Sequence, residues 1–292
     1  TCLKYCGNEP LALMSLLTAL TVLRPLRALV QQARRAGAGE TGAVQPLVRP
    51  VTREIAELSQ AVSSMAQHLE QRADYIRAFA AHVSHEFKTP LAAMRGALEL
   101  LRDHAETMTV AERERFLGNL DQDAARLERL VRRLLELARA DVLQASVSDR
   151  AELTAVVRRM AERYAALGFT VAVLEPLPWL EVAISEDALE SILSNLLDNA
   201  RQHGADVLTL RCSSRAALAC IEISDNGPGI SAANAARVFE PFFTTARARG
   251  GTGLGLAVVR ALLKAYRGRI ELLDGGPGAR LRIELPLASS SR

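Results

Sequence analysis

Apolar residues recur with alternating steps of three and four between positions 55 and 101. This spacing predicts one long helix whose apolar seam suits a coiled coil or a helical bundle. Arg72 is an imperfect residue within the seam, and Pro90 predicts a local break because proline removes a helical hydrogen bond. The seam consists of Ile55, Leu58, Val62, Met65, Leu69, Ile76, Ala80, Val83, Phe87, Met94, Leu98 and Leu101.

A second helix is predicted from about Ala111 to Ala140, after a turn in HAETMTVAE. Its apolar positions also follow bundle spacing, and they include Phe116, Leu120, Leu127, Leu130, Leu134 and Leu137. Two antiparallel helices cannot bury two such stripes by themselves. Pairing with a second copy into a four-helix bundle would bury both stripes, so we expect a homodimer.

The chain starts with an apolar segment of a different kind. The run LALMSLLTALTVL at 11–23 carries no charge and is followed by several arginines. As a helix it spans roughly 20 Å, less than the ~30 Å of a bilayer core. It is either the end of a membrane helix, with the arginines on the cytoplasmic side, or a buried helix of a soluble protein. We expect the membrane helix over 1–23, and further residues before Thr1. An amphipathic helix from Pro25 to Gly37 follows.

The pattern of apolar residues changes after Asp149, where segments with helical spacing and segments with strand-like alternation follow one another. Helices are predicted over 151–167 and 186–202, and FTVAVL, DVLTLRCSS, ALACIEISD and RLRIELPL alternate like strands. The fold class is therefore multidomain, with α-helical modules followed by an α+β sandwich over 150–288 and a loose tail over 289–292.

Composition adds little to this picture. The 292 residues carry a net charge of +3, with 4% aromatic residues. No basic stretch is interleaved with aromatic residues, so we expect no nucleic-acid partner. The four cysteines do not have the spacing of a zinc site.

The stretch HVSHEFKTP at 82–90 carries the first candidate chemistry. At ~100° per residue, His85 lies about 180° from the apolar seam, and Thr89 lies about 40° from His85 and one turn on. An exposed imidazole beside the carboxylate of Glu86 is equipped for proton transfer or nucleophilic attack. The alternative is an ordinary surface histidine.

Two polar clusters follow in the C-terminal part. In SILSNLLDNARQHG, Asn195 and Asn199 are four residues apart on one helix face, and their amide oxygens suit a hydrated Mg²⁺ beside phosphates. In DNGPGI, Asp225 ends a strand, so its carboxylate can accept from an exocyclic amine such as that of adenine. Taken singly, the asparagine pair is more often just a polar stripe on a helix, and DNGPGI is more often just a tight turn.

A third cluster, GGTGLGLAVVRAL, leads from a glycine-rich loop into a helix whose first N–H groups can hold phosphates. Glycine-rich helix starts are also common structural features. The segment FEPFFTTARARGG, from Phe239 onwards, lies between the second and third clusters and suits a mobile lid. The order and spacing of the clusters make the combined signal stronger than its parts.

Together these motifs resemble those of the sensor histidine kinases of bacterial two-component systems, over residues 76 to 288. HVSHEFKTPL resembles their phosphoacceptor box, NLLDNA their N box, and DNGPGI and GTGLGL their glycine boxes. RPLRAL and REIAEL more loosely resemble the HAMP relay module. The resemblance implies a HAMP-like relay over 24–75, a dimerisation and phosphotransfer hairpin over 76–142, and a Bergerat-type ATP-binding domain over 150–288.

The resemblance also implies an activity and a role for each candidate residue. The protein would be a protein-histidine kinase in which His85 is the phosphorylated nucleophile and Glu86 its general base. Thr89 would position a water for dephosphorylation of the partner. Asn199, with Asn195, would bind Mg²⁺ and phosphates.

The remaining roles concern ATP. Asp225 would hold adenine, helped by Gly227 and Gly229. Many members carry Lys and Tyr shortly after the N box, where this chain has Gln202 and His203. The other phosphate-side contacts implied by the resemblance are His203, Gly251, Thr252, Gly253, Leu254 and Gly255.

The implied partners are a second copy of the chain, a cognate response regulator and, through the N-terminal helix, the bacterial inner membrane, with the catalytic part in the cytoplasm. Two rival functions remain. ATPases of the gyrase, mismatch-repair and heat-shock type share the nucleotide-binding fold but carry a Glu where this chain has Asn195, and an amide cannot act as a base. The other rival is a catalytically inactive signalling scaffold.

Overall fold

The computed structural model of the chain describes residues 9–47, 52–104, 106–143, 145–146, 148–246 and 250–288. The chain divides into two compact units between His85 and Glu86, inside helix α3 (Arg53–Asp103). The expected loose tail over 289–292 lies outside the described residues.

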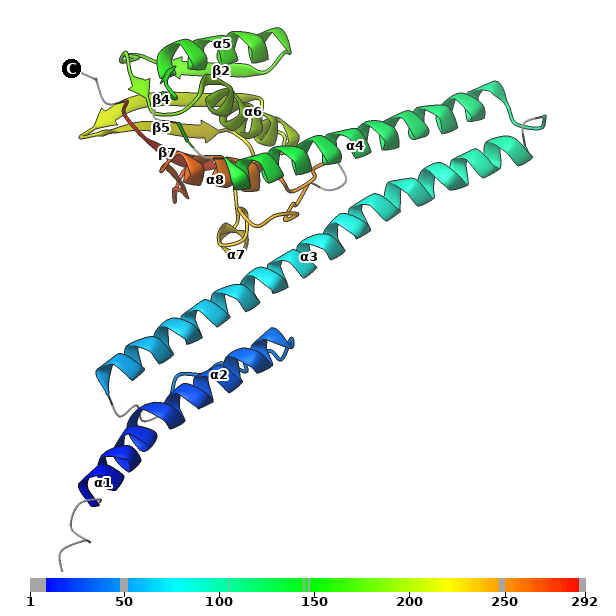
Figure 1. Cartoon of the computed structure of the whole chain (residues 1–292). Coiled ribbons are helices and arrows are strands. Elements are labelled where there is room, and N and C mark those ends of the chain that lie inside the picture. The colour runs from blue at the N-terminus through cyan, green and yellow to red at the C-terminus, as the bar shows by residue number, and fades with distance from the viewer. Residues whose placement is uncertain are drawn as a thin grey trace, which may run out of the picture. The chain divides into compact units, whose positions relative to one another are not determined.

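The N-terminal unit begins with one continuous helical stretch (Figure 1). It comprises α1 (Glu9–Thr18), a π-helical turn (Ala19–Leu23) and α2 (Arg24–Gly37). The π-helical turn ends two residues before Pro25, whose missing N–H and ring are incompatible with regular helical hydrogen bonding to the previous turn. Among the described residues, the helix Leu13–Gly37 is long and apolar enough to cross a membrane by length and composition, and it is nearly all exposed.

The connection after α2 is held along the start of α3 (Arg53–Asp103) by two buried serines. Ser59 Oγ accepts a hydrogen bond from the Leu47 N–H at 2.8 Å, and Ser63 Oγ donates to the Val44 carbonyl at 3.4 Å. Ile55 is buried here, whereas Leu58, Met65 and Leu69 of the same heptad seam remain exposed in the single chain.

Helix α3 passes through Pro90 without interruption, so the predicted local break at this proline is wrong. A single proline removes one N–H donor, and the turns on either side keep theirs. Pro90 is itself buried.

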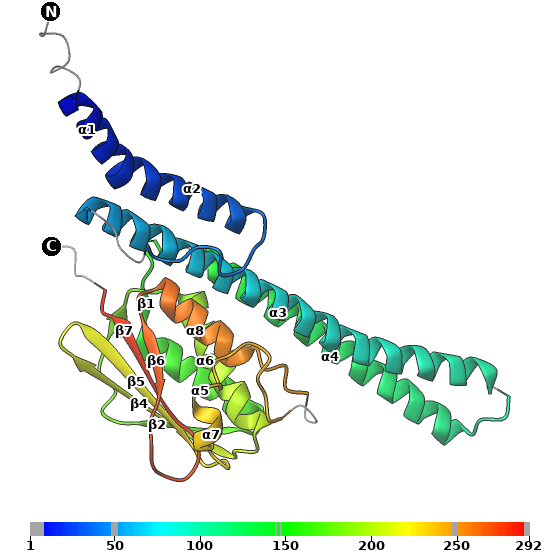
Figure 2. The ribbon, with the colours of Figure 1, turned by 90° about the horizontal axis from the view of Figure 1, so that it is seen from below.

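After α3, the chain reverses into α4 (Val110–Val142), whose start is fixed by a capping box. Glu112 N–H donates to Thr109 Oγ1 at 3.3 Å, and Thr109 N–H donates to Glu112 Oε2 at 3.0 Å. The second half of α3 and α4 form an antiparallel helical hairpin (Figures 1 and 2). The hairpin leaves several leucines at least 40% exposed in the single chain, namely Leu91, Leu98, Leu100, Leu117 and Leu135.

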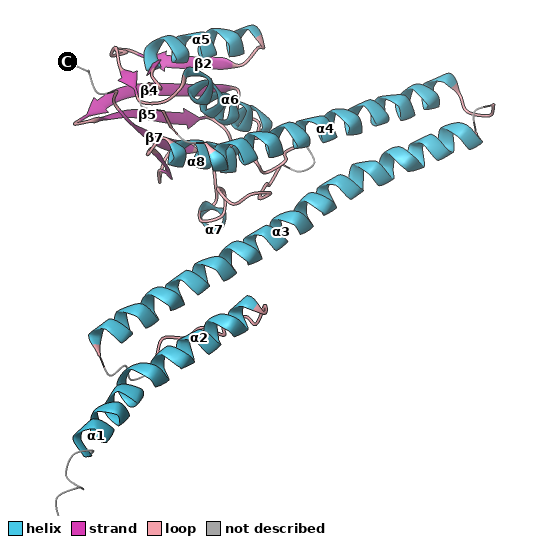
Figure 3. Ribbon diagram, viewed as in Figure 1, coloured by secondary structure: helices cyan, strands magenta, loops and turns pink. Residues whose placement is uncertain are grey.

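The C-terminal part is an α/β sandwich (Figure 3). Its five-stranded sheet has the order β2-β4-β5-β7-β6, in which β2 and β4 are parallel and the other neighbours antiparallel. Helices α5, α6 and α8 form the second layer, and the alternating buried residues of β4 and β5 face this layer. The elements are β1 (Ala151–Glu152), α5 (Leu153–Ala166), β2 (Thr170–Leu174), β3 (Glu181–Val182), α6 (Glu186–Gln202), β4 (Val207–Arg215), β5 (Leu218–Asp225), α7 (Ala232–Ala235), α8 (Gly255–Ala265), β6 (Arg269–Leu272) and β7 (Arg280–Pro286).

This architecture confirms the expected fold class of helical modules followed by an α+β sandwich. The short strands β1, β3 and β6 were missing from the sequence prediction. β1 and β3 pair with each other in a two-stranded ladder, and β1 takes two residues assigned by the pattern to the following helix. β1 and β3, with two residues each, are too short to produce a periodic signal.

The end of α4 lies against α8, at the side of the sandwich that carries the start of α8 (Figure 1). Leu130, Leu137 and Ala140 of α4 are buried, at 2%, 4% and 3% exposure. The last three turns of α4 are therefore part of the core of the C-terminal unit as well as part of the hairpin.

Candidate functional site

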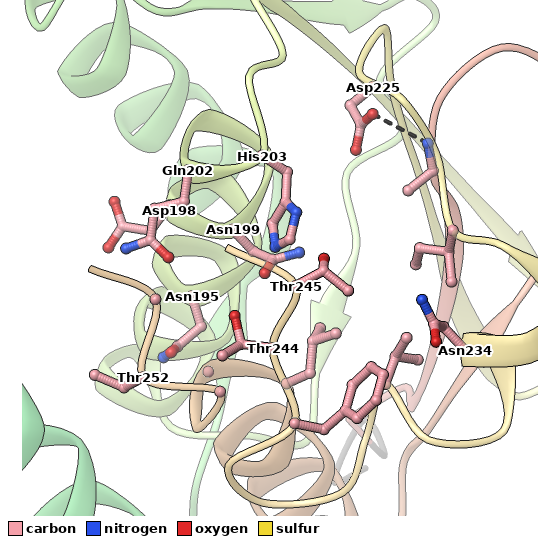
Figure 4. A pocket seen from close by; sticks show the side chains of 18 of the residues that line it. Asn195, Asp198, Asn199, Gln202, His203, Asp225, Asn234, Thr244, Thr245 and Thr252 are labelled. Carbon is pink, nitrogen blue, oxygen red and sulfur yellow. Dashed lines mark hydrogen bonds between the residues drawn. The ribbon is translucent and has the colours of Figure 1, made fainter. Parts of the chain in front are cut away.

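A pocket lies between α6, the segment after β5 and the loop before α8 (Figure 4). Nine of the residues predicted to bind ATP line it: Asn195, Asn199, His203, Asp225, Gly229, Gly251, Thr252, Gly253 and Gly255. Gly227 and Leu254 are not among the lining residues. Leu254 is fully buried.

Helix α6 presents Asn195 and Asn199 to the pocket because they are one turn apart on the same face. The helix is capped at its start by Ser185, whose Oγ accepts a hydrogen bond from the Ala188 N–H at 3.4 Å. Asn195 is 1% exposed, and its Nδ2 donates to the Ser191 carbonyl at 2.8 Å. This bond fixes the amide so that its oxygen Oδ1 is the atom left for other partners.

The acidic wall of the pocket is Asp225, at the end of β5. Its Oδ1 accepts hydrogen bonds from the N–H groups of Gly227, at 2.9 Å, and Ala279, at 3.0 Å. A Cβ on Gly278 would lie 1.8 Å from the Asp225 carbonyl oxygen, so this close approach requires glycine. The second carboxylate oxygen is not used by these bonds and can accept from an exocyclic amine.

The glycine-rich loop before α8 packs tightly on the segment that precedes it. Gly253 has φ +69°, and a Cβ there would lie 2.5 Å from the Phe242 carbonyl carbon. The Phe242 N–H donates to the Gly253 carbonyl at 2.9 Å, and the Gly251 N–H donates to the Ala246 carbonyl at 3.1 Å. These bonds tie the described part of the expected lid to the loop; residues 247–249 lie outside the described part.

The pocket fits a nucleotide with a divalent cation. Gly255 starts α8 and lines the pocket, so the first N–H groups of this helix, which have no helical partners, are available to an anion there. A Cβ at Gly255 would lie 3.2 Å from Asn195 Oδ1, which places the amide oxygen beside the helix start. Amide and carboxylate oxygens form the donor set that Mg²⁺ prefers.

Several lining residues were not predicted as site residues. They include Arg133 of α4, Asp198 of α6, and Asn234, Thr244 and Thr245 of the segment between β5 and α8. Asp198 lies inside NLLDNA, and its position next to Asn199 was an available signal. Arg133 is 62 residues from Asn195, and no local pattern pointed to it.

Asp198 is the centre of a polar cluster in the wall of the pocket. Its Oδ1 accepts from the Tyr164 hydroxyl at 2.8 Å, and its Oδ2 accepts from Arg133 Nη2 at 3.2 Å. Burial, followed by the negative charge of Asp198, raises the pKa of Tyr164. Tyr164 therefore remains a neutral donor that holds the Asp198 carboxylate in place.

The candidate phosphoacceptor lies on α3. His85 and Thr89 are exposed, as the helical geometry predicts, whereas Glu86 is buried at 7% exposure. Glu86 Oε2 accepts from Arg126 Nη2 of α4 at 3.2 Å. An exposed imidazole is thus followed directly by a carboxylate whose orientation is set by the other helix of the hairpin.

Three family models match the chain. The model described as histidine kinase-, DNA gyrase B-, and HSP90-like ATPase matches residues 184–289 and contains all residues of the pocket except Arg133. The His Kinase A (phospho-acceptor) domain matches residues 75–142, and the HAMP domain matches residues 17–71. The three modules therefore follow one another in the order expected from the motifs.

Curated relatives include the sensor protein CreC of Escherichia coli, which is 35% identical over 239 residues, covering 79% of this chain and 50% of CreC. The probable sensor histidine kinase TcrY of Mycobacterium tuberculosis is 34% identical over 264 residues, covering 83% of this chain and 54% of TcrY. The chain thus spans about half the length of these relatives.

Solved structures share the fold. The histidine kinase AdeS of Acinetobacter baumannii matches with a TM-score of 0.53 and 23% identity, covering 70% of this chain and 98% of AdeS. The histidine kinase ThkA, in complex with the response regulator protein TrrA, matches with a TM-score of 0.59 and 19% identity, covering 76% of this chain and 65% of ThkA. The three consecutive family modules and the curated relatives agree with the pocket formed by the N and glycine boxes. The chain therefore belongs to the sensor histidine kinases of bacterial two-component systems.

Proposed function

We propose that the protein binds ATP in this pocket, phosphorylates His85 and passes the phosphoryl group to an aspartate of a response regulator. The observation that carries the proposal is a single chain with both an exposed His85, followed by the oriented carboxylate of Glu86, and a pocket formed by Asn195, Asn199, Asp225 and the glycine-rich loop.

ATP would be held at two ends of the pocket. The exocyclic amine of adenine would donate to the Asp225 oxygen that its backbone partners leave unused, while Gly229 lets the base approach the backbone. The phosphates would lie at the start of α8, near Gly253 and Gly255, with His203 as a further polar contact. Asn199 and Asn195 would hold Mg²⁺, which neutralises charge on the phosphates when it is bound.

In the phosphorylation step, the unprotonated ring nitrogen of His85 attacks the γ-phosphorus. A P–N bond forms, the bond between the γ-phosphorus and the bridging oxygen breaks, and ADP leaves with that electron pair. Glu86 takes the proton of the other ring nitrogen, and Arg126 keeps the Glu86 carboxylate oriented for this role. In phosphotransfer, the P–N bond breaks as a carboxylate oxygen of the regulator forms a bond to phosphorus.

Three further elements of the proposal concern assembly and the reverse activity. Two chains would pair through the exposed apolar face of the hairpin into a four-helix bundle. The exposed hydroxyl of Thr89, one turn after His85, would position a water for hydrolysis of the phosphorylated regulator. The apolar residues up to Leu23 would anchor the protein in the bacterial inner membrane, with HAMP-like residues 24–75 relaying the signal in the cytoplasm.

The test is incubation of the full chain with γ-labelled ATP and Mg²⁺, followed by assay for acid-labile, alkali-stable label. We expect label on the wild type and none on His85→Gln or Asn199→Ala. His68→Gln is the matched control, because His68 is also an exposed histidine of α3. Nucleotide binding without label would refute the kinase and favour an inactive scaffold; release of phosphate without label would favour an ATPase.

A further inference from the structure

Arg133 of α4 reaches into the wall of the nucleotide pocket, although its helix belongs to the hairpin. Its Nη1 donates to Asn195 Oδ1, and its Nη2 donates to Asp198 Oδ2 at 3.2 Å. Both partners lie on α6, in the N box. The guanidinium therefore joins the hairpin to the helix that would hold Mg²⁺ and phosphates.

The Arg133 side chain is held in position by its neighbours on α4. Glu136, one turn later on α4, accepts from Arg133 Nη1 at 3.1 Å, and the Arg133 side chain is only 20% exposed. Leu130 and Leu137, one turn before and after, are buried where α4 lies against α8. Arg133 is thus the polar centre of an apolar contact between α4 and the ATP-binding domain.

The contact uses the atom that the proposed cation needs. The Asn195 Nδ2 group is already bonded to the Ser191 carbonyl, so Oδ1 is the oxygen that this amide can offer to the pocket. A guanidinium stays charged at every pH relevant to proteins. A divalent cation at the same oxygen would meet the positive charge of Arg133 at close range, and the Arg133 and Asn195 side chains are both largely buried, so solvent screens the repulsion weakly.

We propose that Arg133 is an autoinhibitory latch: it keeps α4 docked on the ATP-binding domain by occupying the Asn195 amide oxygen, and the latched state and Mg²⁺–ATP exclude each other. The inference rests on the proposed function, because it assigns regulation to the same nucleotide site.

Two consequences follow from mutual exclusion. Binding of Mg²⁺–ATP displaces Arg133 and loosens α4 from the domain, and any movement of α4 that withdraws Arg133 strengthens Mg²⁺–ATP binding by the same factor. If the latch is closed in most molecules, the apparent association constant for Mg²⁺–ATP is the intrinsic constant multiplied by the small fraction of molecules that are open. A signal that shifts α4 in the hairpin would therefore also set the affinity of the site.

The experiment measures binding of a fluorescent ATP analogue to the full chain in detergent, with Mg²⁺ and with EDTA. We expect Arg133→Gln to bind the Mg²⁺ complex about fivefold more tightly than the wild type, with no tightening in EDTA. Arg133→Lys keeps the positive charge but loses the guanidinium group that bonds to two partners at once. It should therefore tighten binding of the Mg²⁺ complex less than Arg133→Gln does. Arg132→Gln is the matched control and should leave binding unchanged, because Arg132 is an exposed neighbour paired with Glu128 at 2.7 Å.

Hydrogen exchange in the last turns of α4 is the second readout. Mg²⁺–ATP should speed exchange there in the wild type, and Arg133→Gln should exchange fast without nucleotide. Weaker binding of the Mg²⁺ complex by Arg133→Gln would identify Arg133 as a phosphate ligand and overturn the latch, as would unchanged binding. If circular dichroism shows that Arg133→Gln is not folded, the Arg133→Lys comparison carries the test.

The latch and the proposed function fail separately. A wild type that acquires label on His85, beside an Arg133→Gln variant with unchanged Mg²⁺–ATP affinity, refutes only the latch. Tighter Mg²⁺–ATP binding by Arg133→Gln, without label on the wild type, refutes the kinase and retains the latch. A wild type that binds no nucleotide refutes both.

Discussion

Glu86 and Arg126 form an ion pair across the helical hairpin, with 3.2 Å between Glu86 Oε2 and Arg126 Nη2. The carboxylate side chain is 8% exposed and the guanidinium side chain 25%. The residue next to the candidate phosphoacceptor is therefore not a solvated surface carboxylate. Its position depends on a residue of the other helix, 40 positions later.

We expect Arg126→Gln to lower the rate of His85 phosphorylation without removing it, because Glu86 keeps its position in sequence but loses the group that orients it. The variant should also lose about 1–3 kcal/mol of stability, since it leaves a buried carboxylate without its cationic partner. Labelling kinetics and urea unfolding measure the two effects. Arg132→Gln, which removes an exposed arginine of the same helix, is the control. Equal labelling rates for Arg126→Gln and the wild type would show that Glu86 orientation does not matter.

Gly253→Ala should abolish detectable nucleotide binding. The new Cβ would lie 2.5 Å from the Phe242 carbonyl carbon, so the glycine-rich loop must move away from the segment it packs on. Gly275→Ala is the control: Gly275 also has a positive φ, of 84°, but a Cβ there meets nothing within 4 Å. Titration with a fluorescent ATP analogue separates the two variants. Retained affinity in Gly253→Ala would mean that the close approach is not needed for binding.

The Cys212 thiol gives a prediction about alkaline pH. Burial raises its pKa from 9.0 to about 12, so the folded protein keeps the proton that the unfolded chain loses. Stability should therefore be unaffected below pH 9 and fall between pH 9 and about 12, by about 1.4 kcal/mol per pH unit for one such group.

Urea unfolding at pH 8 and pH 10.5 tests the effect of this thiol. Cys212→Ala should reduce the loss between these pH values by about 2 kcal/mol, because the titrating group is gone. Other groups, such as Tyr164, also contribute to the alkaline loss in both proteins. The difference between wild type and variant therefore isolates Cys212, and parallel pH profiles would contradict the prediction.

The exposed apolar face of the hairpin predicts a dimer. Leu98 is 57% exposed in the single chain, and we expect Leu98→Glu to shift the full chain from dimer to monomer, because a carboxylate cannot be buried in the bundle without a partner. Light scattering in detergent measures the mass. Leu167→Glu is the control, since Leu167 is 60% exposed but lies at the end of α5. Equal masses for the Leu98 variant and the wild type would place the dimer contact elsewhere.

Periodicity and motif spacing by themselves determined much of this protein. Helix α6 has the bounds that the pattern predicted, because its start is signalled by Ser185 and its end by the glycine two residues after Gln202. The hairpin helices were placed within two or three residues, and the positions of the candidate phosphoacceptor, N box and glycine boxes followed from local sequence. These features depend on residues only a few positions apart, so they can be predicted from the local sequence.

Only the tertiary structure decided which distant groups meet. Asp225 is oriented by the N–H of Ala279, 54 residues later, and Asn195 Oδ1 accepts from Arg133, 62 residues earlier. The buried Glu86 is paired with Arg126 of α4. Such contacts are selected by the packing of whole elements, here α4 against α8 and α3 beside α4, and no spacing along the chain encodes them. The sequence alone determined the chemistry that is present, and packing decided which groups hold it in place.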